Sequence, residues 1–135
     1  MSTTTFPGRF KSLARISEFV SQFAEEAGLD ETATYTVLVA VDEACTNIIE
    51  HSYGGEGRGD IQCACDVKDD TLTIILRDRG DPFDPASVPE PDFNVPLQEL
   101  KFRGVGLVLM QKIMDEIKFT STPDGENILT MIKRS

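Results

Sequence analysis

The sequence has no surplus of basic residues. It carries 13 lysines and arginines against 23 aspartates and glutamates, which gives a formal net charge of −10 and a pI near 4.4. Proteins that bind nucleic acid need a basic face to displace counterions from the phosphates, so this balance argues against such a partner. The acidity keeps the chain soluble, or it suits a basic partner.

Long apolar runs and paired cysteines are also lacking. No apolar run approaches the roughly 18–20 residues that span a bilayer, and residues 1–15 lack the apolar core of a signal peptide. Three cysteines give no disulfide framework. Cys63 and Cys65 form a lone C-x-C, which favours buried strand cysteines over a metal site with His51. We expect a reduced, cytoplasmic protein with no membrane segment.

The chain does contain enough apolar residues for one core. Of its 135 residues 40% are hydrophobic and 27% are charged, as in an ordinary globular protein. This length is typical of one domain, so we expect a single domain over residues 1–135.

Two helices are predicted in the first half of the chain. Apolar residues recur at helical spacing between residues 8 and 27, and Gly28 can end this helix in the left-handed conformation. Asp30 can cap a second helix that runs to about His51. Its expected buried stripe is Val37, Val41, Ala44 and Ile48. The glycine-rich segment that follows, residues 52–60, is predicted to be a loop.

Two strands follow, and the second carries a carboxylate on its apolar face. Residues 61–67 alternate apolar and polar side chains, and after a turn at 68–70 the segment TLTIILRD, residues 71–78, does the same. Asp78 falls on the face shared by Leu72, Ile74 and Leu76. A carboxylate there costs free energy unless a polar group meets it, so Asp78 is a candidate functional residue.

The rest of the chain completes the expected fold. About 20 residues without regular period, 84–103, are typical of a lid or binding loop. RGVGLVLMQKIMDEI, residues 103–117, predicts a helix, and KFTST and NILTMIKR predict a closing hairpin. The order predicts an α+β fold, a two-layer sandwich with helices on one face of a mixed, largely antiparallel sheet.

Glu43, Asn47 and His51 lie four residues apart, so a regular helix would place them in one row. Asn47 can supply a carbonyl oxygen to magnesium, which takes oxygen ligands. Glu43 can accept a proton from an attacking nucleophile, and a solvated helix face is the alternative for it. For His51 a structural role near the negative end of the helix dipole is favoured.

Two further features point to a nucleotide. Backbone N–H groups at the start of a helix bind phosphate, and Gly104 and Gly106 would leave room for one. The sequence has no Walker loop, and these glycines do not follow a strand as in a dinucleotide fingerprint. Asp78 can accept a hydrogen bond from adenine's amino group, or it can cap a turn by bonding the N–H of residue 80.

Three segments together resemble the GHKL (Bergerat-fold) ATPases. DEACTNIIEHSYG, RDRGDPFDP and RGVGLVLMQKIMDEI resemble the N, G1 and G2 boxes of that superfamily, in its order and spacing. The chain looks most like the anti-sigma-factor serine/threonine-protein kinases of bacterial partner-switching systems. The resemblance implies ATP or ADP and Mg²⁺ as cofactors, Glu43 as general base and Asn47 as magnesium ligand. It also implies a nucleotide pocket that includes Asp78, Gly80, Arg103, Gly104, Val105, Gly106 and Leu107, with Asp78 on the adenine amine.

The same resemblance implies partners. It implies phosphorylation of a serine or threonine on a STAS-type antagonist, capture of a sigma factor once that antagonist is phosphorylated, and a homodimer. The alternative is a non-catalytic, nucleotide-gated module that sequesters a regulatory partner, which has less need of Glu43. A small α+β protein without nucleotide is the third hypothesis.

Two positions depart from the usual boxes. Pro82 stands where the G1 box usually has its second glycine, a form that occurs among anti-sigma-type members. Phe102 stands where some close relatives have a lid arginine. Arg103 or Lys101 is therefore the candidate for contact with the γ-phosphate.

Overall fold

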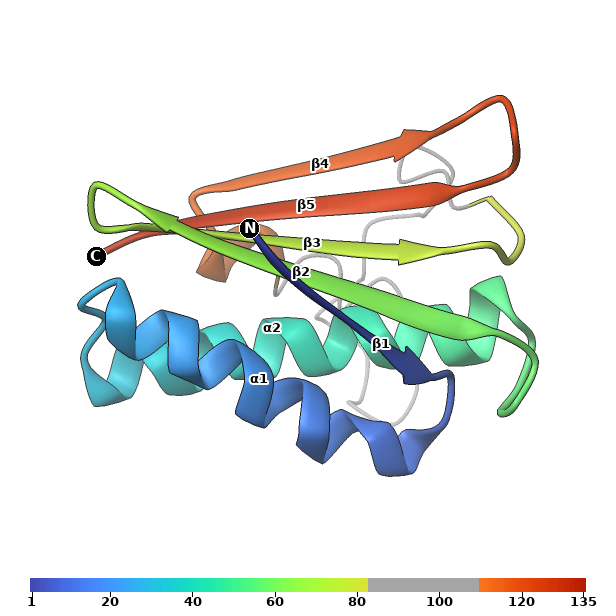
Figure 1. Ribbon diagram of the computed structural model, residues 1–135, viewed down its shortest axis with the longest axis horizontal. Helices are drawn as coiled ribbons and strands as arrows, with labels where there is room; N and C mark the ends of the chain where they lie inside the picture. Colours follow the sequence, from blue (N-terminus) through green and yellow to red (C-terminus); the bar gives the residue numbers. More distant parts are fainter. Residues whose placement is uncertain (83–109) are drawn as a thin grey trace, which may run out of the picture.

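The computed structural model describes residues 1–82 and 110–135, which form two layers. The helices α1 (Leu13–Glu26) and α2 (Glu31–Asn47) cover one face of a five-stranded sheet (Figure 1). Its strands are β1 (Ser2–Pro7), β2 (Asp60–Lys68), β3 (Thr71–Asp78), β4 (Glu116–Ser121) and β5 (Asn127–Arg134). The predicted two-layer α+β sandwich is confirmed. Within the two described stretches, no helix has the length and apolar character needed to cross a membrane.

The end of α1 and the start of α2 lie at the signals in the sequence, whereas α1 begins later than the expected residue 8. A short 3₁₀ turn, Phe10–Ser12, leads into α1, which buries Ile16, Val20 and Ala24. Gly28 follows the helix with φ of +86°, as a residue in the left-handed region. The Asp30 side chain then accepts a hydrogen bond from the N–H of Ala33 at 2.7 Å and caps α2.

The helix α2 continues into a π-helical turn, η2 (Ile48–Ser52). The N–H of Tyr53 donates to the carbonyl of Ile48 at 2.9 Å, five residues back. A π turn holds about one residue more than an α turn. Residue 52, rather than residue 51, therefore continues the row that leads from Asn47, and the expected row through His51 is wrong.

The sheet has the order β1-β2-β3-β5-β4, and its four described pairings are all antiparallel. The turn between β2 and β3 places Asp69 and Asp70 at φ of 51° and 61°. Positive φ at both central residues is the geometry of a type I′ hairpin, whose twist matches the twist of the strands. This register puts Asp78 directly opposite Asn127 on β5.

The edge strand β1 is absent from the sequence-based prediction. Its segment STTTFP has only one large apolar residue, Phe6, so it shows no alternation. Phe6 is buried and contacts the ring of Phe19 on α1 edge-on, with 6.1 Å between ring centroids. The pairing with β2 and the burial of Phe6 define the strand. Neither can be predicted from the sequence of this segment alone.

The core lies between the helices and the sheet and contains all three cysteines. Cys45 on α2 and Cys63 and Cys65 on β2 are buried free thiols, as expected. A hydrogen bond with Cys65 and burial raise the pKa of Cys63, and burial raises the pKa of Cys45. The raised pKa values of Cys45 and Cys63 favour the neutral thiol in both.

The last predicted helix ends earlier than expected. Residues 110–113 are helical, and the chain enters β4 at Glu116, so Ile117 belongs to a strand that pairs with β5. Met110 and Met114 are buried. The closing hairpin is confirmed. The predicted lid at about 84–103 and the start of the predicted helix lie outside the described residues.

Gly80 occupies a place where no side chain fits. A Cβ built there would overlap the carbonyl group of Ser52 and lie 2.8 Å from the Ser52 Cβ. We expect Gly80→Ala to lower the free energy of unfolding by about 3 kcal/mol, because the obstacle is backbone. Gly125→Ala is the comparison, since no atom lies within 4 Å and only its φ of +92° opposes a side chain. That strain costs about 1–2 kcal/mol. Chemical denaturation checks both values, and equal losses would contradict the prediction.

Candidate functional site

A hollow lies between the C-terminal part of α2 and the β3-β5-β4 part of the sheet. Both layers contribute to its walls, and apolar side chains alternate with a few polar ones. Its lining residues are Ala44, Asn47, Ile48, Ser52, Asp78, Met110, Phe119, Thr120, Ser121, Asn127, Ile128 and Leu129. Ligand sites commonly combine such apolar walls with a few fixed polar groups.

Asp78 is the buried charged group of this hollow, with 6% of its surface exposed. Its Oδ1 accepts two hydrogen bonds of 2.9 Å, from the N–H of Gly80 and from the Asn127 side chain. Burial raises the pKa of Asp78, and the bonds from Asn127 and Gly80 oppose that shift. The turn-capping bond predicted as one alternative is present. Both bonds end on Oδ1, so Oδ2 remains an acceptor for a ligand in the hollow.

Asn127 is a site residue that sequence reasoning missed. Its amide donates to Asp78 Oδ1 and also to the carbonyls of Gly80 and Asp81, at 3.0 and 3.3 Å. One side chain thus fixes both the carboxylate and the loop beyond it. The only signal was the register of β3 against β5, which places Asn127 opposite Asp78. That register is set by strands 49 residues apart in sequence.

Glu43 and Asn47 each carry one buried side-chain oxygen atom. Glu43 Oε2 and Asn47 Oδ1 are shielded from solvent, and neither has a hydrogen-bond partner among the described residues. The two residues lie four apart in α2, so their side chains are neighbours on one flank of the helix. Asn47 lines the hollow with Asp78. Buried acceptors without partners are uncommon, and a bound cation or water is one explanation for such a pair.

The environment of Glu43 favours its protonated form. Burial is the main cause that raises the pKa of Glu43, and the neighbouring charges of Asp42 and Glu50 add to it. Within the described residues, no cluster of three or more His, Cys, Asp or Glu side chains is placed to hold a metal ion. A cation at Asn47 would therefore need oxygen ligands from another source, such as a phosphate or water.

We expect Glu43→Gln to stabilise the protein at pH 7. The raised pKa of Glu43 means that the folded state disfavours the carboxylate, so stability falls as pH rises from the ordinary glutamate pKa through the folded pKa. Glutamine removes this penalty, and the gain should vanish below about pH 4. Thermal melts from pH 4 to 8 measure it. Glu25→Gln, at an exposed position of α1, is the control; an equal gain there would contradict the prediction.

His51 lies apart from the hollow, whereas Ser52 lines it. The His51 side chain is exposed, with Nε2 4.0 Å from Oε2 of Glu50. The Ser52 carbonyl accepts a hydrogen bond from the N–H of Asp81 at 2.7 Å. Because the π turn holds one residue more than an α turn, Ser52 takes the position that the four-residue spacing had assigned to His51. The spacing of the sequence gave no sign of this shift.

Gly80 has a structural role and is not one of the residues that line the hollow. Its N–H bonds Asp78, its carbonyl accepts from Asn127, and it packs against Ser52. Arg103, Gly104, Val105, Gly106 and Leu107, the other predicted pocket residues, lie outside the described residues. So do Lys101 and Phe102.

Chemically, the described site can accept a hydrogen bond and bind a cation. Asp78 Oδ2 can accept a bond from an amino group that enters between apolar walls. The Asn47 carbonyl oxygen can contribute one ligand to a hard cation, which takes oxygen donors. The adjacent carboxylate of Glu43 can take up a proton.

Comparisons with known proteins identify the family of the chain. The profile described as "Histidine kinase-like ATPase domain" matches residues 6–133. The chain is 31% identical over 133 residues to a Serine-protein kinase RsbW of Halalkalibacterium halodurans, a match that covers 96% of this chain and 80% of that protein. It is 37% identical over 89 residues to the Serine-protein kinase RsbW of Bacillus velezensis, which covers 62% of this chain and about half, 54%, of that protein. The Listeria monocytogenes protein of the same name is 30% identical over 81% of this chain and 71% of its own length.

Proposed function

The chain belongs to the histidine kinase-like ATPase domain family and binds ATP, and from this premise we propose that it is a serine/threonine-protein kinase of the GHKL type. The relatives named Serine-protein kinase RsbW support the reaction type. The observation that carries the proposal is a pair of buried oxygens, Glu43 Oε2 and Asn47 Oδ1, which lack a hydrogen-bond partner within residues 1–82 and 110–135. They lie one helical turn apart beside the hollow that contains Asp78.

Asp78 and the apolar walls would hold the base of the nucleotide. Adenine carries an exocyclic amine, a donor that matches Oδ2 of Asp78 while Oδ1 stays bonded to Gly80 and Asn127. The side chains of Ala44, Ile48 and Met110 offer the flat ring an apolar environment. The fixed orientation of the carboxylate means that little reorganisation accompanies binding.

Asn47 would hold Mg²⁺ through its carbonyl oxygen. The buried Oδ1 without a partner fits this ligand, because magnesium takes oxygen donors and keeps several waters. When bound, the ion neutralises phosphate charge and orients the γ-phosphate. The predicted contacts of Arg103, Gly104, Val105, Gly106 and Leu107 with the nucleotide, and of Arg103 or Lys101 with the γ-phosphate, belong to this proposal.

Glu43 would act as the general base. The hydroxyl oxygen of a substrate serine or threonine attacks the γ-phosphorus, its proton goes to Glu43, and the bond between the γ-phosphorus and the bridging oxygen breaks to release ADP. The raised pKa of Glu43 makes this carboxylate a stronger base than one in water.

The proposed partners are a STAS-type antagonist as substrate and a sigma factor as the captured protein. We include a homodimer in the proposal. Among the described residues, both helices lie on one face of the sheet, and none covers the other (Figure 1). By strand alternation Ile75 and Ile132 face that open side, and they are only partly buried. Such an apolar face suits a second copy of the chain.

A transfer assay tests the proposal. The purified protein is incubated with γ-labelled ATP, Mg²⁺ and a STAS-domain protein from the same genome. We expect label on a serine or threonine of the STAS protein and much slower labelling with the Glu43→Gln variant. Saturable ATP binding without any transfer would instead favour the nucleotide-gated binding module. No saturable ATP binding would contradict both functions.

A further inference from the structure

Ser52 is a buried hydroxyl residue of the hollow, and the proposed phosphoryl transfer gives it no task. It ends the π turn η2, and 9% of its surface is exposed. Together with Asp78 and Asn47 it lines the hollow. Within residues 1–82 and 110–135 the Ser52 hydroxyl has no hydrogen-bond partner. A buried polar group without a partner is costly, so a ligand that bonds this hydroxyl is favoured.

The Ser52 hydroxyl is also accessible to a molecule in the hollow. Glu43 Oε2 and Asn47 Oδ1 are closed off from solvent, whereas the Ser52 oxygen is not. The small exposed part of Ser52 therefore includes its hydroxyl, at a residue that lines the hollow. A hydroxyl can donate one hydrogen bond and accept others, whereas a carboxylate oxygen such as Asp78 Oδ2 can only accept. Ser52 thus brings a donor to the hollow.

The backbone around Ser52 is fixed against the loop that follows Asp78. The carbonyl of Ser52 accepts a hydrogen bond from the N–H of Asp81 at 2.7 Å. Gly80 packs so closely on this segment that a Cβ built there would lie 2.8 Å from the Cβ of Ser52. The N–H of Gly80 in turn bonds Asp78 Oδ1. Asp78 and Ser52 are therefore held in one unit, although different layers of the fold supply them.

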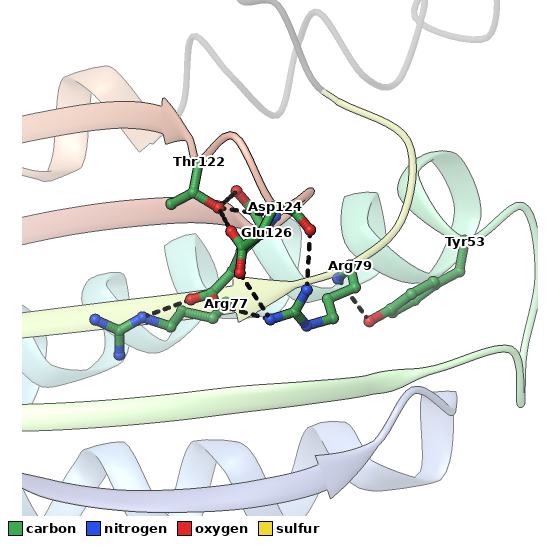
Figure 2. Close-up of polar contacts among 6 residues, drawn as sticks. All are labelled: Tyr53, Arg77, Arg79, Thr122, Asp124 and Glu126. Atoms are coloured by element: carbon green, nitrogen blue, oxygen red, sulfur yellow. Dashed lines mark hydrogen bonds and ion pairs between the residues drawn. The ribbon is translucent and has the colours of Figure 1, made fainter.

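Tyr53, the next residue, fastens the same segment to the sheet. Its hydroxyl accepts a hydrogen bond from the N–H of Arg79 at 3.0 Å (Figure 2) and donates to the carbonyl of Asp60 at 2.6 Å. The guanidinium of Arg79 contacts Asp124 and Glu126, each at 3.4 Å, at the β4–β5 turn (Figure 2). These ion pairs match the charge of Arg79, so its role here is structural. A preorganised pair of ligand contacts loses less entropy on binding than a mobile one.

Adenine presents two groups that match this unit. Its exocyclic amine is a donor, and the ring nitrogens N1 and N7 that flank the amine are acceptors. We propose that Ser52 is a specificity-determining residue of the nucleotide site, whose hydroxyl donates to the ring nitrogen beside the amine held by Asp78. This inference rests on the proposed function, since it requires Asp78 to hold adenine.

The hydroxyl adds a requirement that Asp78 alone does not impose. Asp78 Oδ2 can accept from any amine that enters the hollow, whereas Ser52 needs an acceptor beside that amine. A base without this acceptor leaves the buried hydroxyl unpaired, and a site built for a hydrogen bond rejects such an analogue. Ser52 therefore contributes to the choice of base and takes no part in the transfer step.

Titration of the full chain with ATP and two analogues tests the proposal. In 1-deaza-ATP and 7-deaza-ATP a C–H group replaces N1 or N7 of adenine. Ser52→Ala removes the hydroxyl without adding an atom, and calorimetry measures each affinity. We expect Ser52→Ala to weaken ATP binding about three- to tenfold, as for one neutral hydrogen bond. For the analogue that lacks the contacted nitrogen, the parent and Ser52→Ala should bind equally.

The parent chain gives a second measurement that does not depend on the variant. It should bind that one analogue more weakly than ATP by the same factor. Equal affinity of the parent for ATP and both analogues would overturn the proposal. So would an equal loss in Ser52→Ala for ATP and for both analogues.

Ser12→Ala is the matched control, because Ser12 is a serine with 3% of its surface exposed that lies just before α1 and outside the hollow. Its ATP affinity should equal that of the parent. Equal losses in Ser12→Ala and Ser52→Ala would contradict the assignment, as would an unchanged ATP affinity in Ser52→Ala. A parent that binds no ATP refutes the proposed function and this inference with it, so the two failures are distinct.

Discussion

Glu43→Gln is expected to reduce phosphoryl transfer by about 10²–10⁴-fold, the usual range for loss of a general base. Glutamine has nearly the same shape as glutamate but cannot accept the proton of the attacking hydroxyl. The affinity for ATP should change little, because Asp78 and the apolar walls line the hollow and Glu43 does not. Single-turnover transfer to the STAS protein gives the rate, and calorimetry gives the affinity.

Glu50→Gln is the control for that result. Glu50 is an exposed carboxylate close enough to raise the pKa of Glu43 by repulsion. Its removal changes the local charge by the same amount but leaves the proposed base in place. We expect the transfer rate of Glu50→Gln to stay within a few-fold of the parent. A comparable loss in both variants would assign the effect to charge, and full activity of Glu43→Gln would remove Glu43 from the mechanism.

Asp78→Asn is expected to weaken ATP binding about 10²-fold. A hydrogen bond to a charged acceptor contributes about 1.5–3 kcal/mol. In the variant, the asparagine oxygen can keep the bonds from Gly80 and Asn127, and this orientation turns its NH₂ group toward the hollow. A donor then faces the amine of adenine, which is also a donor. Calorimetric titration with ATP measures the change.

The fold of the Asp78→Asn variant should survive, which makes the binding loss interpretable. Burial raises the pKa of Asp78, so a neutral side chain avoids a desolvation cost. We expect unfolding at pH 7 to occur at the same temperature or slightly higher. Asp124→Asn, on the exposed β4–β5 turn, serves as the control for a lost carboxylate. Unchanged ATP affinity in Asp78→Asn would contradict the proposed adenine contact.

Local signals predicted most of the fold. The apolar spacing of α1 and α2, the glycine at position 28 and the cap at Asp30 act over a few residues, and each has the expected structure. The strand β1 and the early end of the last helix were not predicted. Pairing with β2 defines β1, and pairing with β5 draws Ile117 into β4. Both depend on partners distant in the sequence.

The site was predictable where a residue breaks a local pattern. Asp78 interrupts the apolar face of a strand, and Asn47 lies on the half-buried flank of a helix. Asn127 and Ser52 break no such pattern. Register alone brings Asn127 to Asp78, and the π turn alone brings Ser52 to the hollow. Neither can be derived from spacing counted along one segment.

In terms of insertions and deletions, the π turn at Ile48–Ser52 is one extra residue in an otherwise regular helix. Deletion of a residue within it would not simply shorten a loop. The chain beyond it would rotate by about 100° about the helix axis, the angle of one helical residue. Ser52 would leave Asp81, and Tyr53 would leave Arg79. The length of this segment is therefore as much a part of the site as the identity of its side chains.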